Sequence, residues 1–216
     1  MKSPIEDTIW ASSYGSVAAV QAAFDRLGPE YHEAILSSGV PMGAAEALMP
    51  HLDPKAQGID FGCGSGVLGI MLRGLGLQQP LDGVDISPVM LELARKTECY
   101  RELKRANLLM PEETAPLPGP YDFAISVGVI GDYVPYYSAL PQIVSVLRPG
   151  GFIGFTVDIK STPWPALERL GPELGLTILS EKSLVVPEGK LMAQTYHFFV
   201  ARLRSSQDCE APVFTA

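Results

Sequence analysis

The sequence predicts an α/β fold, namely a doubly wound, mostly parallel seven-stranded sheet with an antiparallel last strand and a helical N-terminal cap. Two observations predict it. From residue 55 onwards, short apolar runs alternate with helical stretches, which is the pattern of βαβ units in a parallel sheet. The first of these runs leads into three closely spaced glycines, Gly62, Gly64 and Gly66, which is typical of a strand–turn–helix unit that receives a ligand.

The length and composition indicate a globular protein. The chain has 216 residues, of which 47% are apolar and 19% charged. At about 150 residues per domain, this length predicts one compact domain with a small addition. We expect residues 1–54 to form a helical cap that is part of the same domain, residues 55–204 to form the core, and residues 205–216 to be a disordered tail.

The charge balance is acidic, with 16 Lys and Arg against 24 Asp and Glu and a formal charge of −8. An acidic chain of this kind lacks the basic surface with which proteins bind a nucleic acid or an anionic membrane surface. Three widely spaced cysteines favour a reduced, cytoplasmic protein over a disulfide scaffold. The sequence shows no metal-ligand spacing, no apolar secretory segment and no apolar run long enough for a membrane span. The oligomeric state, monomer or homodimer, is left open.

The N-terminal cap is predicted to contain three helices. Apolar residues recur at helical spacing in residues 17–27, and this first helix ends at Gly28-Pro29. The second helix, Glu30–Ser38, stops at Gly39. The third helix, residues 41–52, begins with a proline, which suits a first turn.

Strands and helices are predicted to alternate along the core. Five strands are expected at Gln57–Phe61, Leu81–Asp85, Arg101–Ala106, Tyr121–Val127 and Gly151–Val157. Helices are expected between them at Gly66–Leu75, Pro88–Thr97, Leu108–Glu113 and Tyr136–Leu147. The remaining elements are a helix at Trp164–Leu174 and two strands, Thr177–Val186 and Met192–Leu203. The turn-like sequence Pro187-Glu-Gly-Lys190 joins these two strands, which predicts an antiparallel hairpin at the end of the sheet.

The glycine-rich segment carries the clearest functional signal. Its glycines let the backbone turn tightly and approach a ligand, and the next helix offers free N–H groups at its N-terminus. Asp60 lies two residues before Gly62, at a strand end where a carboxylate faces a cationic ligand. Asp85 ends the next strand, 23 residues after Gly62, which is close to the spacing of a carboxylate that binds a ribose diol. Because Ser87 is placed to cap the following helix, Asp85 is left for the ligand.

Residues 64–69 alone satisfy the pattern GxGxxG, which on its own also fits a nicotinamide-dependent dehydrogenase. The register argues against that enzyme, because the loop already begins at Gly62. Binding of a nicotinamide nucleotide would favour the dehydrogenase again.

Three segments in this order, DFGCGSG, VDISPVMLELAR and LRPGG, resemble the class I S-adenosylmethionine-dependent methyltransferases, over about residues 55–203. The resemblance implies a Rossmann-like core that binds S-adenosylmethionine and releases S-adenosylhomocysteine. Asp60 and the three glycines match the family's loop, which wraps the methionine part of the cofactor. Asp85 matches the ribose-binding acid, and LRPGG matches a structural turn before strand five.

The resemblance extends to the adenine side of the cofactor. Ile86 and Met90 match apolar positions beside the adenine, and Asn107-Leu108 matches the pair at its edge, where an Asp is commoner than Asn. The cofactor-binding residues that we expect are Tyr31, Asp60, Gly62, Cys63, Gly64, Gly66, Asp85, Ile86, Met90, Asn107, Leu108 and Ser126.

The N-terminal residues 23–32 and 39–48 are similar to the small methyltransferases named for the Williams–Beuren syndrome critical region, whose core resembles the ubiquinone-pathway enzymes. In that group an aromatic residue matching Tyr31 lies against the cofactor. The chain departs from the group at residues 131–134, which read Gly-Asp-Tyr-Val where the group often has a histidine. The resemblance therefore identifies no general base on the substrate side.

The expected function is methyl transfer from S-adenosylmethionine to a small-molecule acceptor whose nucleophilic atom (O, N, S or C) is left open. The displacement is in line and the sulfur leaves neutral, so positioning is the main task and a base serves only a protonated acceptor. The candidate catalytic residues are Asp132, Tyr133 and His32. Further candidates for the acceptor pocket are Trp10, Tyr14, Tyr136 and Tyr137. Three alternatives stay open: His32 faces solvent, Asp132 is a surface carboxylate, and the tyrosines serve ordinary packing.

Other functions are also compatible with these residues. The same fold can use a bound sulfonium for pericyclic or decarboxylative chemistry, which release of the demethylated cofactor would exclude. A non-catalytic binding module would bind the cofactor without turnover, although the intact Asp60 and Asp85 argue against a dead pocket. Methylation of a protein or a nucleic acid is disfavoured because the chain has no basic strip.

Overall fold

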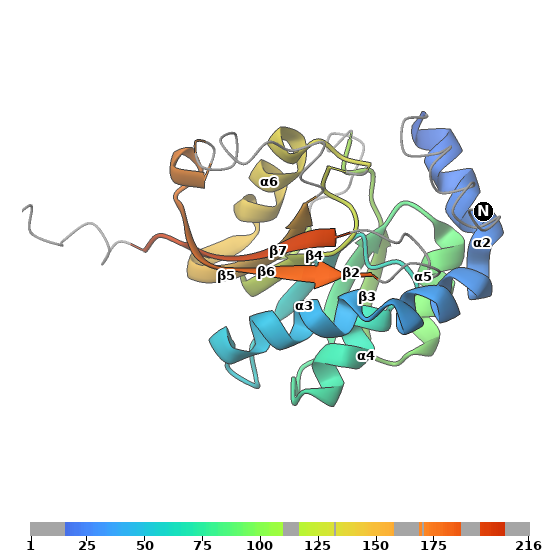
Figure 1. Cartoon of the computed structure of the whole chain (residues 1–216), viewed down its shortest axis with the longest axis horizontal. Helices are drawn as coiled ribbons and strands as arrows, with labels where there is room; N and C mark the ends of the chain where they lie inside the picture. The colour runs from blue at the N-terminus through green and yellow to red at the C-terminus, as the bar shows by residue number, and fades with distance from the viewer. Residues whose placement is uncertain are drawn as a thin grey trace, which may run out of the picture.

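The computed structural model describes residues 16–109, 117–131, 133–157, 169, 171–186 and 195–205. A seven-stranded sheet in the order β3-β2-β1-β4-β5-β7-β6 runs through its centre (Figure 1). The strands are β1 (Gly58–Phe61), β2 (Leu81–Asp85), β3 (Tyr100–Arg105), β4 (Tyr121–Ser126), β5 (Leu147–Val157), β6 (Leu176–Val185) and β7 (Thr195–Leu203). β7 is antiparallel to β5 and β6, and the other neighbouring strands are parallel. The predicted sheet with a reversed last strand is therefore confirmed.

Helices cover both faces of the sheet, as a doubly wound arrangement requires (Figure 1). α6 (Tyr136–Ser145) lies on one face, and α3 (Val40–Leu48) and α4 (Val67–Gly74) lie together on the other. α2 (Val17–Ser38) packs against α5 (Pro88–Lys96), which itself packs on β3. A short 3-10 turn, η1 (Met49–His51), follows α3. Among the described helices, none combines the length and apolarity that crossing a bilayer would need.

α2 is a kinked helix whose two halves correspond to the first two predicted helices. At the kink Gly28 has φ 40° and ψ −125°, and Pro29 follows it inside the helix. Gly39, with φ 78°, ends the second half in the left-handed region that favours glycine. Pro41 then lies in the first turn of α3. The predicted division of residues 17–48 into three helical segments is confirmed.

β5 begins at Leu147, whereas the sequence predicts a turn at Arg148–Gly151 and a strand only from Gly151. The structure places this segment inside the strand, because Leu147 already pairs with Tyr121 on β4. The register then shifts, and Gly150 adopts a φ of 81° at the irregularity. The sequence at Arg148–Gly151 signals a turn locally, but pairing with β4 extends β5 through this segment.

Some sequence predictions lie wholly or partly outside the described residues. They are the helices at Leu108–Glu113 and Trp164–Leu174, the turn at Pro187–Lys190, the start of the strand at Met192–Leu203 and the tail. Of the cysteines, Cys63 and Cys99 are described, and both are buried and free.

Apolar side chains fill the space on both sides of the sheet. Ile59, Ala124 and Ile153 lie side by side on β1, β4 and β5 and belong to the core beneath α6. Phe123 and Phe198 belong to the second core, beneath α3 and α4. Full burial of such a side chain stabilises the fold by about 1.5–3 kcal/mol. The sheet is therefore packed on both faces, and this packing fixes the position of the carboxyl ends of its parallel strands.

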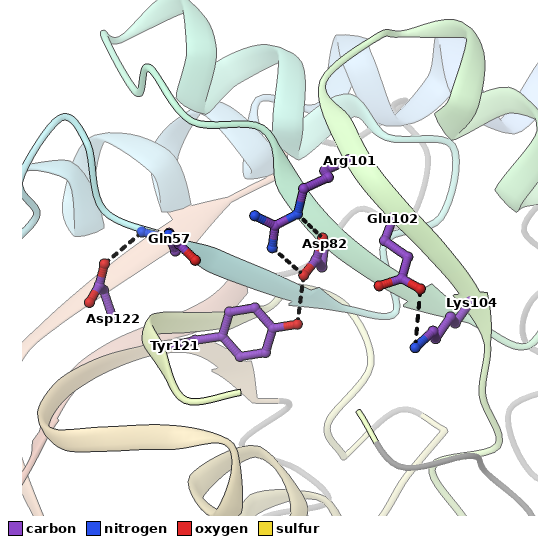
Figure 2. A network of polar contacts seen from close by, with 7 residues as sticks. All are labelled: Gln57, Asp82, Arg101, Glu102, Lys104, Tyr121 and Asp122. Atoms are coloured by element: carbon purple, nitrogen blue, oxygen red, sulfur yellow. Dashed lines mark hydrogen bonds and ion pairs between the residues drawn. The ribbon is translucent and has the colours of Figure 1, made fainter. Parts of the chain in front are cut away.

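A buried carboxylate lies at the amino edge of the sheet, opposite to the carboxyl ends of the parallel strands (Figure 2). Asp82 on β2 is 3% exposed and accepts hydrogen bonds from Nε and Nη2 of Arg101, at 3.1 and 2.7 Å. The hydroxyl of Tyr121 donates to Oδ2 of Asp82 at 2.7 Å. Hydrogen bonding to Asp82 raises the pKa of Arg101, and burial together with this carboxylate raises the pKa of Tyr121. Tyr121 therefore stays a neutral donor, and the carboxylate is paired as a buried charge must be.

The substitution Tyr121→Phe removes one donor from this buried carboxylate and keeps the ring. We expect the free energy of unfolding to fall by about 1–3 kcal/mol, because a hydrogen bond to a charged group is lost. Urea denaturation followed by circular dichroism measures the change. Tyr137→Phe is the control, since Tyr137 is 65% exposed and should lose nothing measurable. Equal stability of the two variants would contradict a stabilising role for the bond to Asp82.

Candidate functional site

The glycine loop, Gly62–Gly66, connects β1 to α4 and lies against the end of β2. The backbone N–H groups of Gly62 and Cys63 both donate to the carbonyl oxygen of Val84, at 2.8 and 2.9 Å. The N–H of Gly64 donates to Oδ2 of Asp85 at 2.8 Å. The loop and the second acid that the sequence singles out are therefore in direct contact.

All three glycines of this loop have positive φ angles, and Gly64 and Gly66 have different surroundings. A Cβ on Gly66 would lie 2.9 Å from Cα of Ala94, so Gly66 makes room for the close approach of α5. A Cβ on Gly64 would meet no atom nearer than Cε1 of Tyr31, at 3.7 Å. The backbone at Gly64 therefore borders open space, whereas Gly66 serves packing.

Asp85 is held at the carboxyl end of β2 by backbone groups. Its Oδ2 accepts from Gly64, and its Oδ1 accepts from the N–H of Ser87 at 2.9 Å. Ser87 caps α5 as predicted, since its Oγ accepts from Met90 N at 3.1 Å, and its hydroxyl donates to Asp25 of α2 at 2.6 Å. Burial raises the pKa of Asp85, and the backbone N–H groups oppose that rise. A carboxylate offers about four acceptor positions, so Asp85 retains capacity for a further donor.

Asp60 lies on β1 beneath the loop and is 1% exposed. The hydroxyl of Tyr100, the first residue of β3, donates to its Oδ2 at 2.8 Å. Burial raises the pKa of Asp60 to about 7; the hydrogen bond from Tyr100 lowers it, and the charge of Asp85 raises it. Because this carboxyl changes charge near neutral pH, a cation nearby would strongly favour its ionised form.

Two cavities adjoin the glycine loop at the carboxyl edge of the sheet. The Asp85 cavity, of about 690 Å³, lies between the first half of α2 and the ends of β2, β3 and β4. The Asp60 cavity, of about 700 Å³, is bordered by the second half of α2, the start of α3, and residues at the ends of β6 and β7. Both volumes include space that is open to solvent. The two cavities share Tyr31, Gly62, Gly64, Val127, Gly128 and Tyr133, so they meet directly over the loop.

Most of the residues expected to bind a cofactor line these cavities. They are Tyr31, Asp60, Gly62, Cys63, Gly64, Asp85, Ile86, Asn107 and Leu108. Gly66, Met90 and Ser126 do not line them. Met90 is fully buried in α5, and Ser126 donates to the carbonyl oxygen of Phe61 at 3.0 Å. These residues support the walls of the site from behind.

The structure separates the residues expected to take part in catalysis. Tyr133 lies where the two cavities meet. His32 lines neither cavity, and its Nδ1 lies 3.0 Å from Oγ of Ser65 in the glycine loop. Tyr136 and Tyr137 form an edge-to-face pair with each other outside both cavities. Asp132, Trp10 and Tyr14 lie outside the described residues.

Several lining residues were missed by the sequence analysis. Phe24 of α2 packs edge to face with Tyr31 and with Tyr133, with ring centroids 5.3 and 5.4 Å apart, and forms one wall of the Asp85 cavity. Val186 and Tyr196, at the ends of β6 and β7, line the Asp60 cavity. The helical spacing of apolar residues in 17–27 includes Phe24, but this spacing does not distinguish a residue that lines a cavity from one that packs in the core. Tyr100, which donates to Asp60, was also missed, because the predicted third strand begins only at Arg101.

Comparison with known proteins adds family information to this geometry. A family model described as "Methyltransferase domain" matches residues 40–200. The chain is 32% identical over 144 residues to aklanonic acid methyltransferase DauC of Streptomyces sp. strain C5, covering 64% of this chain and 61% of that protein. It is 29% identical over 126 residues to ribosomal protein L11 methyltransferase of Actinobacillus pleuropneumoniae, covering 57% of this chain and 41% of that protein. The chain thus spans less than two thirds of the length of these relatives.

Solved structures share the fold. The 1,6-didemethyltoxoflavin-N1-methyltransferase of Burkholderia thailandensis, solved with 1,6-didemethyltoxoflavin and S-adenosylhomocysteine, has a TM-score of 0.67, 19% identity, and coverage of 87% of this chain and 88% of that one. The magnesium protoporphyrin IX methyltransferase of Synechocystis PCC 6803, solved with S-adenosylmethionine, has a TM-score of 0.61, 18% identity, and coverage of 91% and 90%. At these identities the likeness concerns the fold.

The raised pKa of Asp60 predicts a pH dependence of stability. The folded protein keeps this proton up to about pH 7, whereas an unfolded Asp loses it near its ordinary pKa of 3.8. The stability that Asp60 contributes is therefore full below about pH 4 and is lost as the pH rises to about 7, by roughly 1.4 kcal/mol per pH unit. Asp60→Asn should remove this slope, which urea denaturation of both proteins between pH 4.5 and 8 measures. A constant difference in stability between the two across that range would contradict a raised pKa.

Proposed function

The chain belongs to the S-adenosylmethionine-dependent methyltransferases, and from this premise we propose that it transfers the cofactor's methyl group to a small-molecule acceptor. The observation that carries the proposal is the meeting of two cavities over the glycine loop, at Tyr31, Gly64 and Tyr133. A cofactor lying across the loop and an acceptor in the adjoining space would have their reacting atoms side by side. Alignment of this kind is the main requirement of an in-line displacement.

The Asp85 cavity has the chemistry that the adenosine part of the cofactor requires. Asp85 presents carboxylate oxygens with remaining acceptor capacity, which suits the two hydroxyls of a ribose. Ile86 and Leu108 supply apolar surface for a flat base, and Asn107 supplies polar atoms at its edge. The open space over Gly64 lets the chain of the cofactor pass close to the backbone. The residues present therefore fit the cofactor.

Asp60 and the first loop residues fit the methionine end of the cofactor. When bound, the cofactor supplies an electrophilic methyl group on a positively charged sulfur. Asp60 lines the adjoining cavity together with Gly62 and Cys63, so it provides negative charge on that side. A cationic group there favours the ionised form of Asp60 over the protonated form that burial favours. We therefore assign Asp60 to cofactor binding rather than to proton transfer with the acceptor.

The rest of the Asp60 cavity is suited to an uncharged, largely apolar acceptor. Ile35, Val40, Pro41, Val186 and Tyr196 line it. Among the residues that the structure describes, no Lys, Arg or His lines either cavity, and the charged side chains are the carboxylates of Asp60 and Asp85. An anionic acceptor would meet like charge and no cationic side chain among these residues, which disfavours its binding.

Tyr31 supports the proposed likeness to the Williams–Beuren and ubiquinone-pathway type of methyltransferase. It comes from the N-terminal cap and lies where both cavities meet, as an aromatic residue against the cofactor would. Tyr133 occupies the same junction from the segment after β4, where that group often has a histidine. We propose Tyr133 as the residue that positions the acceptor, and we assign no role in the chemistry to His32, whose ring is engaged with Ser65.

Asp85 provides the test of cofactor binding. Calorimetric titration of the wild-type protein should show binding of S-adenosylmethionine and S-adenosylhomocysteine and no binding of NAD. Asp85→Ala should weaken binding of both sulfur nucleotides by about 1–3 kcal/mol, because the partner of a buried hydrogen bond is lost. Asp53→Ala, at an exposed acid outside both cavities, is the control. Unchanged affinity in Asp85→Ala would remove Asp85 from the site, and binding of NAD alone would favour a dehydrogenase.

An acceptor screen tests the proposed substrate class. We expect S-adenosylhomocysteine to form with uncharged or cationic aromatic acceptors, such as phenols and amines, and not with carboxylates or phosphates of the same size. Mass spectrometry of the acceptor and of the released nucleotide measures both products. Purified ribosomal protein L11 serves as the protein probe, since one relative is named for that substrate. Methylation of L11 without turnover of any small acceptor would overturn the small-molecule proposal, and consumption of the cofactor's sulfonium without methylated product would indicate other chemistry.

A further inference from the structure

We propose that Tyr100 is a positioning residue whose hydroxyl fixes the Asp60 carboxylate for the cofactor, and that Gly69 and Gly83, with Gly66 beside them, leave room for its ring. The proposal rests on the assignment of Asp60 to cofactor binding. It concerns a residue of β3 that lies outside both cavities, 40 residues from Asp60 along the chain.

The ring of Tyr100 lies in a slot formed by three glycines, two from the loop and helix α4 and one from β2. A Cβ on Gly66, at the start of α4, would lie 3.1 Å from Cε2 of the ring, and one on Gly69, within α4, would lie 2.8 Å from the same atom. A Cβ on Gly83, within β2, would lie 2.9 Å from Cδ1. Real Cβ atoms essentially never approach closer than 3.0 Å, so positions 69 and 83 must lack a side chain for the ring to fit. At position 66 the contact with the ring is tight, and the backbone of Ala94 is closer still. Two of these glycines belong to the GxGxxG pattern, which here serves the ring as well as the ligand.

The slot directs the hydroxyl of Tyr100 onto Asp60. Its oxygen lies 2.8 Å from Oδ2, a normal length for a hydroxyl that donates to a carboxylate. Burial raises the pKa of Tyr100 most, and the facing titratable groups, Asp60 on β1 and Cys63 in the loop, raise it further. Tyr100 is therefore a neutral donor at all working pH values. A donor of this kind favours the ionised form of Asp60, against burial and the nearby charge of Asp85.

The amino edge of the sheet contains a second pair of a tyrosine and a buried aspartate, which serves as a comparison. Tyr121 donates to the buried carboxylate of Asp82 at 2.7 Å (Figure 2). Neither residue lines the Asp85 or the Asp60 cavity. Tyr100→Phe and Tyr121→Phe thus remove the same chemical group from the same kind of partner, one beneath the cofactor loop and one away from it. A general loss of stability affects both variants, whereas an effect through Asp60 affects only the first.

The first measurement follows the Asp60 carboxyl directly. A ¹³C NMR titration of the cofactor-free protein should give a pKa for Asp60 near 7 in the wild type. In Tyr100→Phe this midpoint should rise by about one pH unit, because a hydrogen bond to the charged form is lost. In Tyr121→Phe it should stay unchanged. An unchanged midpoint in Tyr100→Phe would overturn the proposal, and this outcome does not depend on any cofactor.

The second measurement is the affinity for S-adenosylmethionine by calorimetry from pH 6 to 8.5. Asp60→Asn is the reference, because its affinity should change with pH only through titration of the nucleotide's own amine. Relative to that reference, wild-type binding should tighten as Asp60 ionises, and in Tyr100→Phe the same tightening should occur about one pH unit higher. At pH 7 the Phe variant should therefore bind several-fold more weakly, and at pH 8.5 the two should converge. Tyr121→Phe should follow the wild-type curve.

The outcomes separate this proposal from the proposed function. A loss of affinity in Tyr100→Phe that is the same at every pH, or no loss at all, would overturn the positioning role while leaving the methyltransferase assignment in place. Failure of the wild-type protein to bind either sulfur nucleotide at any pH would overturn the proposed function, and the NMR midpoint would still report whether Tyr100 acts on Asp60. Denaturation midpoints at each pH establish that every variant is folded when it is measured.

Discussion

The hydrogen bonds between the glycine loop and the end of β2 are the interaction on which the rest of the site depends. The Val84 carbonyl accepts from two successive loop N–H groups, and Asp85 accepts from a third. β1 and β2 are neighbouring parallel strands, so their carboxyl ends meet at one edge of the sheet. The bonds then set the loop against that edge, which brings Asp60 and Asp85 to adjoining cavities. Without this contact, the glycines would be a flexible turn with no fixed relation to either acid.

The two acids differ in burial and in their hydrogen-bond donors, and this difference explains the behaviour of each. Asp85 is surrounded by backbone N–H groups, which stabilise its charged form against burial. Asp60 lies deeper, and the phenol of Tyr100 is the side-chain donor that lowers its pKa. Asp85 is thus fixed by the fold itself, whereas the charge of Asp60 responds to what lies beside it. A cationic cofactor stabilises that charge, so occupancy of the site and ionisation of Asp60 reinforce each other.

Features encoded in adjacent residues could be predicted from the sequence. Gly28-Pro29 and Gly39 divide the N-terminal helices where expected, and Ser87 caps α5, because each signal acts within one turn of backbone. The alternation of strands and helices gave the sheet for the same reason. Contacts between distant residues could not be predicted: Tyr100 reaches Asp60 across 40 residues, and Asp25 reaches Ser87 across 62. Spacing cannot encode such pairs, since packing of whole elements creates them.

The kink in α2 lets one helix cover two cavities. Its first half is joined to the β2–α5 connection, where Ser87 donates to Asp25, and its Phe24 closes the Asp85 cavity. Its second half is joined to the glycine loop through His32 and Ser65 and borders the Asp60 cavity. A straight helix would leave one of the two open. The non-helical backbone at Gly28 turns the second half toward the loop, and Tyr31, just beyond the kink, therefore lies where the cavities meet.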